Sequence, residues 1–202
     1  MSLIYGDNFV GQTVLPIEDP DFEPEHGYTY EATFYRLFYS AKVVNAKDLI
    51  LPATSLTNGC YGGMFQNCTT LITAPELPST TLTKYCYQNM FNGCTSLTSA
   101  PELPATTLIS DCYNGMFYGC TALVNTPELL ATTPAAGCYD LMFSGCTNVN
   151  YIKCLLAGTN LDFYYWTSGV AANGTFIKNT NATWTMGMNG IPTSWTVETA
   201  NS

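Results

Sequence analysis

The chain has 202 residues, of which 10% are charged, 47% are hydrophobic and 13% are aromatic. Because disordered chains combine low hydrophobicity with high charge, this composition predicts a folded chain whose surface is polar but nearly uncharged. The net charge of −9, from 6 basic and 15 acidic residues, excludes the basic patch that binding to nucleic acid or an anionic membrane requires. No stretch of the sequence approaches the roughly 20 apolar residues of a membrane span.

Residues 1–33 precede the regular part of the chain and contain an acidic, proline-rich run over residues 18–26. The segment is predicted to be an extended N-terminal arm or cap that covers the first repeat. Alternatively, it docks the protein onto other virion subunits. The residues that follow Met1 include neither a basic segment nor a long apolar one, so we do not expect a secretory signal peptide.

A 26-residue repeat dominates residues 34–155 and predicts a solenoid of about five units. One unit of this length cannot bury its own apolar side chains, whereas stacked units align identical residues into one continuous core. A degenerate first unit places Phe34 and Lys42 at the two cysteine positions. The predicted structural rows are Cys60, Cys86, Cys112 and Cys138; Met64, Met90, Met116 and Met142; and Cys68, Cys94, Cys120 and Cys146.

Each unit is predicted to contain a helical turn followed by a short strand. Cys86, Met90 and Cys94 are spaced i, i+4 and i+8, which places them on one face of a helix. Gly93 suits the left-handed conformation that ends a helix, and residues 97–103 are extended. The expected fold class is therefore an α/β repeat.

Nine cysteines are present, eight in the two repeat rows and one at Cys154. Their spacing within a unit matches no zinc pattern, so no metal site is predicted. Disulfides within or between units remain possible. The main interpretation is a set of buried free thiols, because free cysteine packs as a small hydrophobic residue.

One glutamate recurs in each unit and suggests a candidate binding face. At the strand spacing these carboxylates would stand about 5 Å apart. They are interpreted as solvated side chains or as a stripe that binds a cation or a partner. A glycosidase pair is disfavoured, because repeated positions have similar environments and an acid and a nucleophile need different ones. The candidate binding face comprises Glu76, Glu102, Glu128, Thr73, Ser99 and Trp166.

Residues 156–202 contain all three tryptophans and are predicted to fold as a small β cap. The pair Asn173-Gly174 is typical of a hairpin turn. Core filling is the main interpretation of the tryptophans, and an exposed Trp166 that stacks on a sugar or a partner is the alternative. His26 is the only histidine, which leaves no second candidate for a catalytic triad, and we expect no enzyme activity and no cofactor.

The run from Cys86-Tyr87 through Met90-Phe91 to Cys94 and Leu97, followed by Ala-Pro-Glu-Leu-Pro, resembles the BspA-type leucine-rich repeats. These occur in surface proteins of gut anaerobes and in proteins of their phages. Residues 169–178 and 190–197 resemble the tail that follows such arrays. The resemblance implies a right-handed, leucine-rich-repeat-like solenoid used for adhesion or recognition.

The expected function is non-enzymatic recognition of a protein or a surface glycan, on a bacterial cell surface or a phage virion. Two alternatives remain. The first is a structural capsid or tail decoration protein without a ligand of its own. The second, more remote, is a polysaccharide hydrolase that uses the glutamates.

Overall fold

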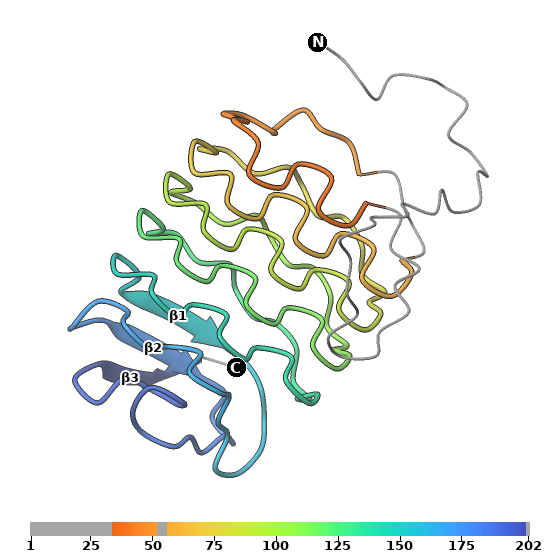
Figure 1. Ribbon diagram of the computed structural model, residues 1–202. Helices are drawn as coiled ribbons and strands as arrows, with labels where there is room; N and C mark the ends of the chain where they lie inside the picture. The colour runs from red at the N-terminus through yellow and green to blue at the C-terminus, as the bar shows by residue number, and fades with distance from the viewer. Residues whose placement is uncertain (1–33, 52–55, 201–202) are drawn as a thin grey trace.

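The computed structural model describes residues 34–51 and 56–200 of the chain. The arm predicted for residues 1–33, including His26, therefore lies outside the described residues, and so do residues 52–55 and 201–202. The described chain winds in successive coils that lie side by side (Figure 1).

Parallel pairing joins each coil to the next. Isolated parallel bridges link Asn45 to Thr73, Thr73 to Ser99, and Ser99 to Asn125. Further along, the strands β1 (Tyr151–Cys154), β2 (Thr175–Lys178) and β3 (Thr196–Thr199) form a three-stranded parallel sheet in the order β1-β2-β3. A parallel bridge from Leu129 to Cys154 connects the bridged coils to β1. Pairing thus continues across the boundary predicted at residue 156.

The predicted α/β fold class is wrong. The described residues contain no helix, and their only regular secondary structure is the three-stranded parallel sheet. The segments expected to be helical are instead series of tight turns in which every fourth residue has a positive φ, as at Tyr85, Asn89 and Gly93. We call these segments turn ribbons; they cover residues 34–40, 58–67, 84–93, 110–119 and 136–145.

Backbone hydrogen bonds explain why a turn ribbon is not a helix. The Gln88 and Met90 amides donate to carbonyls within their own ribbon, those of Tyr85 and Tyr87, at 3.1 and 3.2 Å. The intervening amides of Tyr87, Asn89 and Phe91 instead donate to carbonyls of the next coil, at 2.9 to 3.0 Å. A helix satisfies its amides within its own segment. A turn ribbon satisfies only alternate amides locally, so it depends on the coil stacked beside it.

Aromatic rings pile up inside the stack. The rings of Tyr61, Tyr87, Tyr113 and Tyr139 stack with centroids 5.7 to 6.2 Å apart, and a parallel row runs from Phe65 to Phe143 at 5.7 to 5.9 Å. The methionine and cysteine rows are buried beside them. Because equivalent side chains from adjacent coils touch, the core is continuous along the stack.

The first coil is in a different register from the one predicted. Phe34 stacks on Tyr61 at 5.4 Å and Phe38 stacks on Phe65 at 5.3 Å. In both pairs the separation along the chain exceeds the repeat length by a single residue. Phe34 therefore occupies the tyrosine position and not the first cysteine position, and Ala41 rather than Lys42 takes the place of the second cysteine.

The hairpin predicted at Asn173-Gly174 is wrong, because β2 starts just after it and pairs in parallel with β1. Gly174 has a different role. A side chain there would collide with the Asn150 carbonyl and the Trp195 ring, so glycine permits the close approach of two coils. The loop 185–191 pairs with the coil before it, where the Phe163 amide donates to the Asn189 carbonyl at 2.8 Å.

Candidate functional site

Most of the candidate binding face is exposed. Thr73 and Ser99 pair with each other in the row of parallel bridges, and the side-chain amide of Asn125 donates to the Ser99 hydroxyl at 2.8 Å. Glu76, Glu102 and Glu128 are exposed on three successive coils. The repeat therefore presents one column of small polar residues and one column of carboxylates.

The three glutamates differ in their surroundings. The Glu128 carboxylate accepts a hydrogen bond from the Lys153 ammonium group at 3.0 Å. Glu76 and Glu102 instead lie at a shallow apolar groove with a volume of about 300 Å³. We call it the proline groove; apart from the two glutamates, it is lined by Ala74, Pro75, Leu77, Pro78, Pro101 and Pro104.

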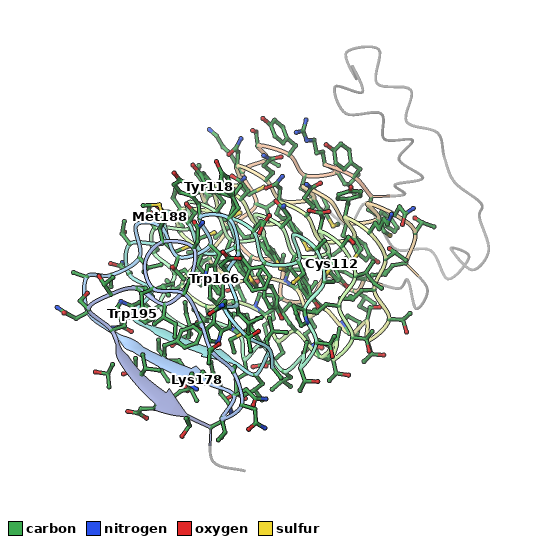
Figure 2. The ribbon with its side chains drawn as sticks, turned by 90° about the horizontal axis from the view of Figure 1, so that it is seen from below. Cys112, Tyr118, Trp166, Lys178, Met188 and Trp195 are labelled. Atoms are coloured by element: carbon green, nitrogen blue, oxygen red, sulfur yellow. The ribbon has the colours of Figure 1, made fainter. Side chains whose placement is uncertain are left out.

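Trp166 does not belong to a binding face, which corrects that part of the prediction. Its side chain is 0% exposed, and its indole nitrogen donates to the Gly190 carbonyl at 2.8 Å. The ring stacks on Tyr139 at 6.2 Å and on Trp184 at 5.2 Å. Trp166 continues the aromatic stacking inside the core, in the body of the molecule (Figure 2).

All nine cysteines are free and buried. In the second cysteine row each thiol donates to a phenylalanine carbonyl of the preceding coil, as from Cys94 to Phe65 and from Cys120 to Phe91, both at 3.1 Å. Burial raises the pKa of the Cys146 thiol to about 12, so it keeps the proton that it donates. No group of three or more histidine, cysteine or acidic side chains is arranged for a metal within the described ranges.

An open hollow lies where the repeat changes its period, and sequence reasoning missed it. Hydrogen-bonded partners on adjacent coils are 26 residues apart at Ser99 and Asn125, but 24 residues apart at Asp140 and Tyr164. The hollow has a volume of about 520 Å³ and is open to solvent. We call it the end hollow; its lining includes residues 134–137, Asp140, Asn160, Asp162, Phe163, Tyr164 and Asn189.

The backbone fixes the aromatic part of the end hollow. The Tyr164 amide donates to Asp140 Oδ1 at 2.8 Å, and the Tyr165 amide donates to Asn189 Oδ1 at 2.9 Å. The two tyrosine rings meet edge to face at 4.6 Å. Tyr164 is nevertheless 60% exposed, so one large ring is held in place and open to a ligand.

The electrostatics of the end hollow are set by its carboxylates. Burial raises the pKa of Asp140, and the nearby negative charges of Asp111 and Asp162 raise it further, while the hydrogen bond from Tyr164 opposes the shift. Carboxylate oxygens accept hydrogen bonds and the amides of Asn160 and Asn189 can also donate them. The site can therefore bind hydroxyl or peptide groups beside an aromatic face.

A shortened step between coils marks this region once the coils are placed. The Phe163 ring meets the Tyr139 ring edge to face at 5.5 Å, and the separation of these two residues along the chain is shorter than the repeat length. A shortened step means that two coils cannot remain in contact along their whole length, so a hollow forms at the junction. Apart from Asp140, which lies in the last ribbon, the polar residues that line it follow the repeat region and have no repeat equivalent that would have identified them.

No helix in the described part of the chain is long and apolar enough to cross a membrane. No family model, curated protein or solved structure matches the chain. The resemblance to BspA-type repeats therefore stays a prediction.

Proposed function

We propose that the chain is a non-enzymatic recognition module that binds a protein or a surface glycan, displayed on a bacterial cell surface or a phage virion. The observation that carries this proposal is the end hollow, where an exposed tyrosine ring stands among carboxylate and amide side chains. Concave sites with an aromatic surface and a few fixed polar groups are the usual form of a binding site.

The scaffold around the end hollow supports the same proposal. The aligned aromatic rows are buried, so they hold the stack together instead of contacting a partner. Hydrogen bonds between coils keep the hollow's residues in place before a ligand arrives. Such pre-organisation lowers the entropy that binding costs.

The first prediction concerns Tyr164. Replacing Tyr164 with alanine removes the exposed ring, and binding to a panel of bacterial surface glycans and envelope proteins should weaken about tenfold, since an aromatic contact contributes on the order of 1.5 kcal/mol. Tyr118→Ala is the matched control, because Tyr118 is 42% exposed and lies outside the end hollow. Binding by surface plasmon resonance that is equal for both variants, or absent from the unmodified chain, would contradict the proposal.

A further inference from the structure

The proline groove is separate from the end hollow and is not used by the proposed function. It lies across two coils, with apolar walls and the exposed carboxylates of Glu76 and Glu102 at its rim. We infer that this groove docks an extended peptide segment that carries a lysine side chain.

Charge complementarity identifies the occupant. Glu76, Glu102 and Glu128 occupy equivalent positions on successive coils, and in the part of the chain that the structure describes the Lys153–Glu128 contact is the only ion pair. This contact supplies an internal precedent, because an ammonium group binds one of the three carboxylates at 3.0 Å. The two carboxylates at the groove have the same chemistry and no such cation from the described residues.

The walls of the groove favour a peptide over a small free amine. Proline, leucine and alanine present aliphatic surface, which packs against the methylene stem of a lysine while its ammonium group reaches a rim carboxylate. Proline has no amide hydrogen, so four of the wall residues offer no backbone donor to a ligand. Binding must then combine apolar contact with the ion pair, which an extended lysine-bearing segment provides.

The charge of the whole molecule acts in the same direction. The chain has 15 acidic and 6 basic residues, a net charge of −9, which attracts a cationic segment at a distance. Binding at the groove should therefore weaken as ionic strength rises.

The experiment uses the full chain and a fluorescent peptide, acetyl-Pro-Lys-Ala-Lys-Pro-amide, in low salt. Anisotropy should show binding that falls at least fivefold when both lysines are replaced by norleucine, which keeps the stem and removes the charge. The double variant Glu76→Gln/Glu102→Gln should bind the lysine peptide with an affinity at least fivefold lower than that of the unmodified chain. The control Asp48→Asn/Glu198→Gln changes the net charge by the same amount at exposed positions outside the groove. Its affinity for the lysine peptide should stay within twofold of that of the unmodified chain.

Several outcomes would overturn the inference: no binding up to millimolar protein, equal binding of the lysine and norleucine peptides, or an unchanged affinity in Glu76→Gln/Glu102→Gln. If 1,5-diaminopentane displaces the peptide at equal concentration, the apolar walls contribute nothing and the peptide proposal also fails. Circular dichroism verifies that the variants are folded. Tyr164→Ala should leave peptide binding unchanged, so failure at the groove and failure at the end hollow are told apart.

Discussion

The buried thiols show how a single residue type can serve a repeat. Cysteine is small enough for the crowded interior of each coil, and its thiol donates a weak hydrogen bond to a carbonyl of the preceding coil, as from Cys146 to Phe117 at 3.0 Å. The role requires a protonated thiol. Burial supplies this condition, because desolvation disfavours the thiolate.

This residue-scale property predicts a dependence of stability on alkaline pH. Burial raises the pKa of Cys112 from 9.0 to about 12. Between these values the unfolded chain has lost the proton that the folded chain still holds. The free energy of unfolding should therefore change little between about pH 7 and 8 and fall as pH rises from 9 towards 12. Urea denaturation at pH 7.5, 9.5 and 10.5 measures the effect.

The variant Cys112→Ala isolates one thiol. It should be less stable at pH 7.5, because a buried side chain is shortened. Above pH 9 its free energy of unfolding should fall more slowly than that of the unmodified chain, by up to about 1.4 kcal/mol per pH unit. Parallel pH profiles for the two proteins would show that Cys112 ionises equally in the folded and unfolded states.

At the scale of the element, the turn ribbon explains why the helix prediction was wrong. A spacing of i, i+4 and i+8 marks one face of a helix, but it also marks one face of a ribbon whose turns repeat at every fourth position. The distinguishing signal is the residue type at the positive-φ positions. Within the ribbons from residue 58 to 145, these are glycine, asparagine or aspartate except at Tyr85 and Leu141. Glycine recurring at such short intervals would weaken a helix by about 1 kcal/mol each time, so the pattern favours turns.

The ribbon also explains why a glycine can follow a larger polar residue at equivalent positions of successive coils. At three places a glycine follows a polar residue in the equivalent position of the coil before. An added Cβ at Gly93, Gly115 or Gly137 would collide with Asn67, Asn89 or Asp111 respectively. The glycine thus provides both the positive φ and the space for its neighbour's side chain.

Two glycines allow the effect of the positive φ to be measured separately from the effect of the space left for a neighbouring side chain. Gly115 and Gly119 have φ values of 61° and 70°, but only at Gly115 would a Cβ collide with Asn89, since the nearest atom to a Cβ at Gly119 is 4.0 Å away. Gly119→Ala should lower the free energy of unfolding by about 1 kcal/mol, the cost of the left-handed conformation. Gly115→Ala should lower the free energy of unfolding by about 1 kcal/mol more than Gly119→Ala, because the added Cβ collides with Asn89. The second substitution Asn89→Gly in the same chain should remove most of that additional loss. Equal urea midpoints for the two alanine variants would contradict this account.

For the molecule as a whole, the repeat length and the rows of core residues could be read from the sequence, because identical residues at a fixed step must align when coils stack. Details that depend on departures from the repeat could not. Phe34-Tyr35 and Phe38-Tyr39 offer two adjacent aromatic residues each, so the first coil can fit in two registers, and packing against Tyr61 selects one. The end hollow arises where the step between coils becomes shorter than the repeat, a change visible only once the final coils are placed.

Stacking also implies that each coil supports the next, and Phe117 tests this directly. It is fully buried, with its ring 5.7 Å from Phe91 and 5.9 Å from Phe143. Phe117→Ala should lower the free energy of unfolding by about 3 to 5 kcal/mol. It should also interrupt the coupling between the coils before and after Phe117. All three tryptophans lie in the C-terminal coils, so tryptophan fluorescence follows that half, whereas far-ultraviolet circular dichroism follows the whole chain.

In the unmodified chain the two signals should change at the same urea concentration, because neighbouring coils share backbone hydrogen bonds at every ribbon. In Phe117→Ala the transitions should separate, with each half unfolding at its own midpoint. The exposed residue Tyr118 provides the control, and Tyr118→Ala should keep one coincident transition within about 0.5 kcal/mol of the original stability. A single, slightly shifted transition in Phe117→Ala would mean that cooperativity does not pass through the aromatic rows, and that the inter-coil backbone hydrogen bonds alone couple the coils.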